Sequence, residues 1–591
     1  MRTTTNRVLA ISKDEFKHWF QKCTPPNGWS KVLAVANSGG PDSTCLLFLL
    51  HRYLSGNVLP NLPQRIVSVT VDHDLQPSSV SMADSCAKFA RLLPGVEHIT
   101  TKIPWSNPPF PRRPVPGVEA IENTARLARY EMLFRSMREV RPEAASVIAF
   151  GHHADDQVET ALMRFGRGTT ELGGAGMRSC RRWGMGHQTL KDGEDTLGWN
   201  GMEGMDKWIV RPLLDVSKDR ILATCEENNL EYVTDQSNFQ PHITVRNAIR
   251  KLLTKGSRLD DSRVVSPEPL PNNIKEQLSN INTAISSLES VSVDLDSGAE
   301  RLRSAVKHLT LQVRDIDCQV DSHLKRCMIP SPTGTFLMSS RNLASIQGDL
   351  LRTALVLRVM RYVSFYPWGS LRADGNRRKK MREQIIDKLW TLNPFQAGIG
   401  MFVAGGGVLW TPVLVRGNSL KTPERLARSG FGQDEVIGWL ASRQPPLNKR
   451  KMEERNMRNP LRVDVTENLK QVLDKARETP FVDILWDCRF LVRFDLAKMP
   501  LNIRTELANP RSNQSSILIV SNTRWYWPEI VLQQEKEQTV LHSDIKENKR
   551  IPPFLGPEDD VYPRRAYWRR YDAPVVSDWI HVEWIRPLTA I

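Results

Sequence analysis

The fold is decided by residues 32–50, which read VLAVANSGGPDSTCLLFLL. The apolar run at 32–36 predicts a buried strand, and a helix is expected to begin near Pro41, with a glycine turn between them. A turn of this kind points backbone N–H groups and a helix N-terminus at an anion, so it predicts a phosphate site. The stretch lacks the Gly-Lys-Ser/Thr ending of a Walker loop, which argues against an ordinary ATPase or GTPase.

Strand and helix patterns alternate along residues 30–254. We expect further strands at 66–71, 99–103 and 146–150, and helices at 117–139 and 155–165. This alternation predicts an α/β fold with a doubly wound parallel sheet, whose ligand lies beyond the carboxyl ends of the strands. The glycine loop (residues 38–43), residues 72–73 and residues 151–153 all follow predicted strands, so three polar clusters are expected at one edge of the sheet.

The glycine loop resembles the pyrophosphate-binding loop of the N-type ATP pyrophosphatases, Ser-Gly-Gly-x-Asp-Ser. Those enzymes cleave ATP between its α and β phosphates and adenylate an oxygen of their substrate. The resemblance implies that ATP and its pyrophosphate are held by Ser38, Gly39, Gly40, Pro41, Asp42 and Ser43, with Asp42 acting through Mg²⁺. The alternative is a glycine turn that joins a strand to a helix and binds nothing.

Two further clusters suit a nucleotide. Asp72 and His73 follow the second strand, where they either border a nucleotide or simply end the strand in polar residues. The predicted helix at 117–139 places four side chains on neighbouring positions: Glu122, Arg126, Arg129 and Tyr130. This set is either a surface ion-pair ladder or a means of neutralising phosphate charge.

The stretch 151–160 reads GHHADDQVET and is the densest in reactive side chains. Asp155 stands where a helix N-cap belongs, so its carboxylate could simply cap the helix. Asp156 and Glu159 are three residues apart and share a helix face, where they can hold an ammonium group or Mg²⁺. Further on, the fragments at 211–214, 235–238 and 246–250 supply arginines that suit RNA phosphates.

Taken in this order, the clusters resemble the tRNA(Ile)-lysidine synthase family over about residues 30–250. The family pattern runs roughly Ser-Gly-Gly-x-Asp-Ser, Val-Asp-His-Gly-Leu-Arg, Asn-Leu-Glu-x-x-Ala-Arg-x-x-Arg-Tyr, His-His-x-Asp-Asp-Gln-x-Glu-Thr, Arg-Gly, Arg-Pro-Leu-Leu, Asp-x-Ser-Asn and Arg-Asn-x-x-Arg. This chain departs from it at Asp74 and Gln76, where Gly and Arg are usual, and at Ala120, where Asn is common. It also departs at residues 169–172, which follow the Arg-Gly pair. These departures affect local substrate contacts rather than the ATP loop.

The resemblance implies an ATP-dependent ligase that joins free L-lysine to C2 of the wobble cytidine of isoleucine tRNA with the anticodon CAU. ATP adenylates the C2 oxygen and releases pyrophosphate, and the ε-amine of lysine then displaces AMP. The implied catalytic residues are Asp42, Arg126, Arg129, His152, Asp155, Asp156 and Glu159, with His153 as an alternative base. ATP contacts are implied for the glycine loop, Asp72 and His73, and tRNA contacts for Arg211, Arg246 and Arg250.

Two alternatives stay open. A 2-thiolation enzyme with the same loop would deliver sulfur through cysteines or a cluster. The eight cysteines of this chain are scattered and form no Cys-x-x-Cys, so no metal site built from Cys and His is expected. A non-catalytic tRNA-binding protein with a decayed loop is the other alternative. The residues that argue against decay are intact: Ser38, Asp42, Asp155, Asp156 and Glu159.

Length, charge and hydropathy indicate how the whole chain is organised and which class of partner it binds. With 591 residues and a net charge of +15, we expect more than one domain and a nucleic-acid partner, although the charge could serve solubility alone. No apolar run approaches the length of a bilayer span, so no membrane segment is expected. The expected parts are an N-terminal segment at 1–29, the α/β domain at 30–254, a linker at 255–272, a helical tRNA-binding domain at 273–400 and a small α+β domain at 401–591.

Two expectations concern the ends of the chain. The first thirteen residues carry Arg2, Arg7 and Lys13 and no acid, which suits a targeting segment. Because the family resemblance implies lysidine, which belongs to bacteria and organelles, we expect a mitochondrial location, with the cytoplasm as the alternative. The tryptophans of the C-terminal region form either a platform for RNA or a packed core.

Overall fold

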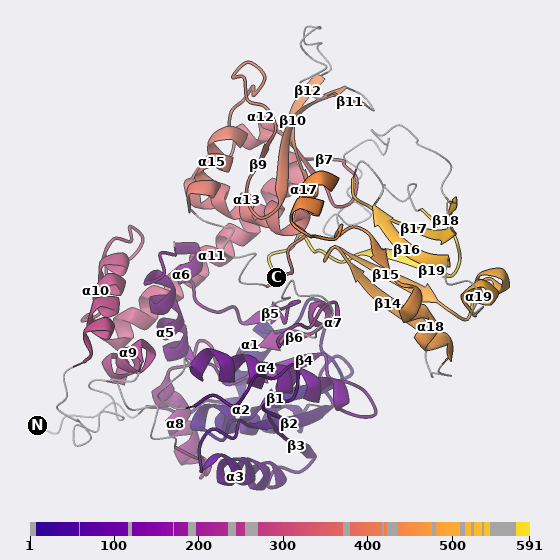
Figure 1. Cartoon of the computed structure of the whole chain (residues 1–591). Coiled ribbons are helices and arrows are strands. Elements are labelled where there is room, and N and C mark those ends of the chain that lie inside the picture. Colours follow the sequence, from indigo (N-terminus) through magenta and orange to yellow (C-terminus); the bar gives the residue numbers. More distant parts are fainter. Residues whose placement is uncertain are drawn as a thin grey trace, which may run out of the picture. The chain divides into compact units, whose positions relative to one another are not determined.

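The computed structural model describes residues 8–57, 59–115, 121–169, 171–186, 197–234, 244–254, 270–369, 379–416, 419–421, 435–474, 480–508, 515–521, 525–534, 537–543 and 575–591. The chain divides into two compact units, Met1–Asp315 and Ile316–Ile591. Figure 1 shows the elements of both. The expected fragment at 235–238 lies outside the described residues.

Unit 1 is built on a six-stranded sheet in the order β3-β2-β1-β4-β6-β5. Its strands are β1 (Val32–Ala36), β2 (Arg65–Asp72), β3 (Val96–Lys102), β4 (Val147–Phe150), β5 (Cys180–Arg182) and β6 (Trp208–Val210). All neighbours are parallel except β5, which runs antiparallel to β6. The predicted α/β class and the three expected strands are confirmed, and β3 and β5 are the edge strands.

Helices follow each of the first four strands of unit 1 along the chain, and the last helices follow one another without a strand between them (Figure 1). The helices are α1 (Lys13–Lys22), α2 (Pro41–Leu54), α3 (Ser79–Arg91), α4 (Ile121–Glu139), α5 (Ala154–Phe165), α6 (Glu171–Gly174), α7 (Glu203–Asp206), α8 (Lys218–Glu227), α9 (Val245–Thr254), α10 (Asn272–Ser286) and α11 (Ala299–Cys327). Unit 1 ends within α11, at Asp315. The predicted helices at 117–139 and 155–165 correspond to α4 and α5.

The core of the sheet follows from alternation along the strands. Val32 and Ala34 of β1 pack with Ile148 of β4 and with Leu133 and Phe134 of α4. The intervening residues of β1 are also fully buried, as expected for a strand covered on both faces. Because β1 lies between β2 and β4, the carboxyl ends of these three strands meet at one edge, as predicted.

The segment before β1 belongs to this unit. Phe16 and Phe20 of α1 are buried, and the ring of Phe20 stacks on Trp29 at 4.2 Å. The amide of Ile11 donates to the hydroxyl of Thr224 at 2.9 Å. From Ile11 onward, the expected N-terminal segment is therefore part of the folded core.

A second apolar layer joins α5 to later helices. Val158 and Leu162 of α5 pack with Ile249 of α9, Ile281 of α10 and Leu302 of α11. The first unit thus extends to residue 315, inside the segment where we expect a helical domain. This packing matters for the site, because it fixes α9 and the start of α11 beside α5.

The described residues of unit 2 form three antiparallel sheets. Their strand orders are β11-β10-β12-β8-β7 with β9 beside β10, β13-β16-β17-β18, and β14-β15-β19. The strands are β7 (Met328–Ile329), β8 (Phe336–Ser339), β9 (Phe402–Val403), β10 (Val408–Arg416), β11 (Ser419–Lys421), β12 (Glu435–Arg443), β13 (Val463–Asp464), β14 (Phe481–Trp486), β15 (Phe490–Asp495), β16 (Ser515–Ser521), β17 (Pro528–Gln534), β18 (Glu537–His542) and β19 (Ile580–Trp584). The helices are α12 (Ser340–Ala344), α13 (Asp349–Val363), α15 (Lys379–Leu389), α17 (Lys449–Glu454), α18 (Thr466–Asp474) and α19 (Leu501–Ala508).

The interior of unit 2 holds large aromatic side chains and several charged ones. Four tryptophans are almost completely buried: Trp410, Trp439, Trp486 and Trp579. These four therefore belong to a packed core and not to an exposed platform. Asp487 accepts from Nε of Arg443 at 2.8 Å and from Nε of Arg489 at 2.6 Å, and all three side chains are at most 3% exposed.

No helix in the described part of the chain combines the length and the hydropathy that crossing a bilayer requires.

Candidate active site

The glycine loop is held by a side chain that precedes it. The buried Asn37 accepts through Oδ1 from the amide of Gly39 at 3.1 Å and from the hydroxyl of Ser43 at 3.2 Å. Gly39 has a φ of +79°, and a Cβ there would lie 2.9 Å from Sγ of Cys86. Helix α2 begins at Pro41 with Gly40 as its N-cap, which has no side chain to accept from the first-turn N–H groups. These N–H groups are therefore available to an anion, as predicted.

The end of β4 touches the start of α2 through backbone alone. A Cβ on Gly151 would lie 2.8 Å from the carbonyl oxygen of Asp42 and 3.0 Å from the amide nitrogen of Ser43. Only glycine permits this approach. Gly151 thereby brings the histidines that follow it against the glycine loop.

Asp42 is the meeting point of three elements. Its Oδ1 lies 2.5 Å from Nζ of Lys218 at the start of α8, and 3.5 Å from Nε2 of His153. The same His153 nitrogen lies 3.5 Å from Oδ2 of Asp156. His153 is thus placed between the glycine loop and the acids of α5.

The N-cap of α5 is His153 and not Asp155. Nδ1 of His153 accepts from the amide of Asp155 at 3.2 Å, and the carboxylate of Asp156 accepts from the amide of His153 at 3.0 Å, which completes a capping box. The interpretation of Asp155 as an N-cap is therefore wrong, because the extended backbone at His153 places its ring nitrogen where a capping oxygen would stand. The Asp155 carboxylate instead pairs with Arg303 of α11.

The remaining acid of α5 is paired with arginines of α9. Glu159, whose side chain is 4% exposed, accepts from Nε of Arg250 at 2.6 Å and from its Nη2 at 3.2 Å. Arg246 lies 3.7 Å from Glu159 and 3.2 Å from Glu122 of α4. The two arginines that we expected at tRNA thus lie among the expected catalytic acids.

Burial and charge set different protonation behaviour for these acids. Burial raises the pKa of Glu159, and the neighbouring Asp156 adds to this, against the opposing effect of Arg250. Burial would also raise the pKa of Asp156, but His153, His152 and Arg250 together hold it well below its usual range. Asp156 is therefore a stable anion, whereas Glu159 is the acid closest to taking up a proton.

His152 is held as a neutral ring. It stacks on Phe150 at 5.4 Å, and its Nδ1 accepts from Nε of Arg211 at 3.1 Å. Burial lowers the pKa of His152 to about 3, with Arg211 and Arg126 contributing against the opposing effect of Asp156. Because Nδ1 accepts a hydrogen bond, the ring proton is on Nε2.

Beside His152 lies a group of arginines around Tyr130. Burial would raise the pKa of Tyr130, yet its pKa is lowered because four guanidinium groups outweigh burial: Arg126, Arg211, Arg181 and Arg129. Arg126 also donates to the Tyr130 hydroxyl at 3.2 Å. Within the described residues none of these four arginines is ion-paired with a carboxylate. The group is a concentration of positive charge.

Known proteins resemble the part of the chain that carries this site. Residues 10–256 match the family model described as the PP-loop domain. This part of the chain is therefore similar to a PP-loop domain. The chain is 34% identical over 245 residues to the tRNA(Ile)-lysidine synthase of Bradyrhizobium sp. strain BTAi1, covering 42% of this chain and 57% of that protein.

Two further relatives carry the same name. The protein of Rhodopseudomonas palustris is 34% identical over 222 residues, covering 38% of this chain and 53% of the relative. That of Bacillus subtilis is 30% identical over 221 residues, covering 37% and 39%. The chain spans about half the length of the curated relatives it matches. Among solved structures, the U34-tRNA thiolase NcsA from Methanococcus maripaludis is 18% identical, and the match covers 50% of this chain and 89% of that one with a TM-score of 0.28.

Asp72 and His73, which were predicted to border the nucleotide, form hydrogen bonds within the turn that follows β2. Oδ1 of Asp72 accepts from the amide of Asp74 at 2.9 Å, and Nδ1 of His73 accepts from the amide of Leu75 at 3.2 Å. These bonds shape the turn after β2. Asp72 and His73 therefore lie at the predicted edge of the sheet. Their Oδ1 and Nδ1 atoms stabilise the turn.

The sequence analysis did not identify three residues of the site: Asn37, Lys218 and Arg303. Asn37 could have been identified from the sequence, because it is a polar residue between the first strand and the glycine loop. Lys218 and Arg303 carried no signal, because only tertiary packing brings them to Asp42 and Asp155. Among the described residues no group of three or more His, Cys, Asp or Glu side chains is arranged to hold a metal ion.

Proposed function

We propose that this chain is a tRNA(Ile)-lysidine synthetase, which uses ATP to join free lysine to C2 of the wobble cytidine in isoleucine tRNA with the anticodon CAU. The observation that carries the proposal is the position of His153, 3.5 Å from both Asp42 of the PP-loop and Asp156 of the acid cluster. A site that binds ATP is thereby joined to one that suits an ammonium group. The relatives that bear this name support the same assignment.

In this proposal the PP-loop binds the β and γ phosphates of ATP. The first-turn N–H groups of α2 and the ammonium of Lys218 supply positive charge there. Asp42 suits Mg²⁺, because that ion is commonly held by one or two carboxylates together with substrate phosphates and water. When bound, Mg²⁺ would neutralise charge on the departing pyrophosphate.

The first reaction is attack of the cytidine O2 on the α phosphorus, which breaks the bond to the β phosphate and releases pyrophosphate. The arginine group around Tyr130 stabilises the charge that develops on the phosphates. In this proposal the neutral His152 is a hydrogen-bond donor through Nε2 at this edge of the sheet. It does not act as a base, because its pKa is about 3. The adenylated oxygen is then a good leaving group.

The second reaction is attack of the lysine ε-amine on C2, which expels AMP. Asp156 is the anion that holds the ammonium form, since its pKa is low and its carboxylate faces the PP-loop through His153. Before attack the ammonium must lose a proton. Glu159 is the acceptor whose raised pKa suits this transfer best. His153 orients the carboxylates, since its Nδ1 is already an acceptor.

The test is incubation of the full chain with ATP, Mg²⁺, radiolabelled lysine and a CAU transcript, beside a transcript with uridine at the wobble position. Label is expected in the first transcript alone, with pyrophosphate released in equal amount. Asp42→Asn should abolish both signals, and Asp156→Asn should abolish incorporation. Asp84→Asn, an exposed acid of α3, is the matched control and should leave both intact.

Two results would contradict the proposal. Pyrophosphate release without incorporation of lysine would keep the ATP chemistry and assign another nucleophile. Binding of the transcript without any turnover would favour a tRNA-binding protein that has lost its activity.

A further inference from the structure

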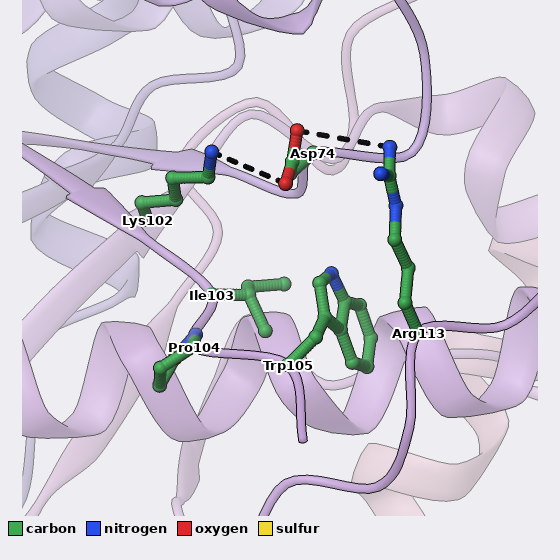
Figure 2. A pocket seen from close by; sticks show the side chains of 6 residues that line it. All are labelled: Asp74, Lys102, Ile103, Pro104, Trp105 and Arg113. Carbon is green, nitrogen blue, oxygen red and sulfur yellow. Dashed lines mark ion pairs between the residues drawn. The ribbon is translucent and has the colours of Figure 1, made fainter. Parts of the chain in front are cut away.

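A hollow lies at the same edge of the sheet as the PP-loop (residues 38–43). It has a volume of about 360 Å³ and is lined by Asp74, Lys102, Ile103, Pro104, Trp105 and Arg113 (Figure 2). Lys102 ends β3 and Asp74 follows β2, so the hollow lies at the carboxyl ends of these strands. Neighbouring strands are about 4.8 Å apart, and β3 is two strands from β1, which places the hollow roughly 10 Å from the PP-loop.

The rim of this hollow carries three charges. Figure 2 shows the carboxylate of Asp74 between the two cations. It lies 3.1 Å from Nζ of Lys102 and 3.7 Å from Nη2 of Arg113, and the three side chains are 32%, 58% and 54% exposed. An ammonium and a guanidinium present eight N–H donors in total, more than one carboxylate can accept. The rim is therefore net positive and retains donors for an anionic group.

The floor is apolar and fixed in place. The indole Nε1 of Trp105 donates to the backbone oxygen of His73 at 2.9 Å. Trp105 also packs with Ile103, Phe110 and Met132. The aromatic surface beside the rim is thus tied to the turn that follows Asp72 at the nucleotide edge.

Asp74 distinguishes this chain from the pattern it resembles. Its φ is +50°, a left-handed conformation that glycine adopts readily and aspartate tolerates better than most residues. Its amide donates to Oδ1 of Asp72 at 2.9 Å, which stabilises the turn. Where the family pattern has glycine, this chain therefore adds a carboxylate to the hollow, in a backbone conformation that glycine also adopts.

We propose that this hollow binds one nucleotide of the RNA substrate, next to the cytidine that reacts. The base lies on the Trp105 and Pro104 surface, the phosphate is bound by Lys102 and Arg113, and Asp74 accepts from an exocyclic amino group of the base. Side chains of these types recognise unstacked bases of single-stranded RNA. The inference rests on the proposed function, in which the neighbour of the reacting C in CAU is an adenosine, whose base carries such an amino group.

The test measures binding of a fluorescein-labelled anticodon stem-loop RNA with CAU to the full chain by anisotropy. Trp105→Ala should weaken binding about tenfold, and Trp105→Phe should retain most of it. The double variant Lys102→Gln/Arg113→Gln changes only exposed side chains. It should reduce the slope of log affinity against log salt by roughly 0.7 for each phosphate that is no longer neutralised. Lys31→Gln, an exposed cation just before β1 at the opposite edge, should bind as the unmodified chain does.

The role of Asp74 is tested separately. The unmodified chain should bind the CAU stem-loop more tightly than one with uridine in the middle position, because uracil has no exocyclic amino group. Asp74→Gly should remove this preference and leave the turn intact. In turnover assays Trp105→Ala should raise the KM for RNA and leave kcat unchanged.

Three outcomes would overturn the inference. The first is that the Trp105 variant and the Lys102/Arg113 variant bind RNA as tightly as the unmodified chain does. If these variants still incorporate lysine, the proposed function stands without this hollow. The second is loss of ATP binding in these variants with RNA binding retained, which would assign the hollow to a free mononucleotide. The third is failure of the unmodified chain to bind the stem-loop or to incorporate lysine, and then both proposals fail.

Discussion

Replacing Arg250 with methionine should leave the buried carboxylate of Glu159 without its main partner. Removing one member of a buried ion pair costs about 3–5 kcal/mol. We expect the lower end here, about 3 kcal/mol, for two reasons. Arg250 itself is 33% exposed, and Arg246 remains 3.7 Å from Glu159. Urea titration of the full chain measures this loss as a decrease in the free energy of unfolding.

The pH dependence of this loss has a definite sign. Burial raises the pKa of Glu159 in the folded chain, so its contribution to stability is complete below the pKa of the unfolded chain and is lost as the pH rises through the folded value. Arg250→Met raises the folded pKa further. The deficit of the variant should therefore be largest at about pH 7 and smaller at about pH 5.

A double-mutant cycle separates the pair from other effects. With Glu159→Gln already present, Arg250→Met should cost much less, because no buried charge is left unpaired. Lys31→Gln is the comparison, since its pair with Glu143 spans 3.9 Å between side chains that are 68% and 51% exposed, and it should change stability by less than about 1 kcal/mol. A cost for Arg250→Met below about 1 kcal/mol, or one that does not change with pH, would mean that Arg250 does not stabilise a buried Glu159 carboxylate.

Three other substitutions test other parts of the structure. Gly151→Ala places a Cβ 2.8 Å from the backbone of α2, so it should lower the free energy of unfolding by about 1–3 kcal/mol and weaken ATP binding. The control is Gly56→Ala, because the atom nearest to a Cβ there is 3.8 Å away. Thermal unfolding and nucleotide titration should not distinguish this control from the unmodified chain. The unmodified chain should lose stability as the pH falls from 6.5 toward about 3, because the folded pKa of His152 is depressed, and His152→Asn should lose less over that range in acid unfolding. Asp487→Asn removes the carboxylate that pairs with two buried guanidinium groups and should lower the unfolding free energy of the full chain by about 3 kcal/mol. An unchanged unfolding free energy would contradict a stabilising role for Asp487.

The sequence was sufficient for the parts of the fold that depend on local pattern. The strand at 32–36, the turn and α2 lie where apolar runs and glycines predicted, and the meeting of three strand ends follows from parallel topology. The boundaries differ by a few residues, as at β3, where the expected strand began at Ile99 and the structure begins at Val96. Short polar edge strands give weaker hydrophobic signals than central ones.

The electrostatics of the site could not be predicted in the same way. Lys218 is separated from Asp42 by 176 residues, and Arg303 from Asp155 by 148. No periodicity links residues that only packing of α5 with α9, α10 and α11 brings together. For the same reason the ion pairs of Arg246 with Glu122 and of Arg250 with Glu159 were not expected, and the contact of these two arginines with RNA stays a prediction.

The sheet of unit 1 ends in two strands that discourage pairing with another molecule. At one edge β3 places Glu97 and Lys102 at exposed positions, and at the other β5 is only three residues long. Charge on an edge strand and extreme brevity are two ways in which proteins prevent a sheet from adding strands of a neighbouring chain. At the high concentrations that purification and spectroscopy require, this sheet should therefore stay closed to intermolecular β-pairing.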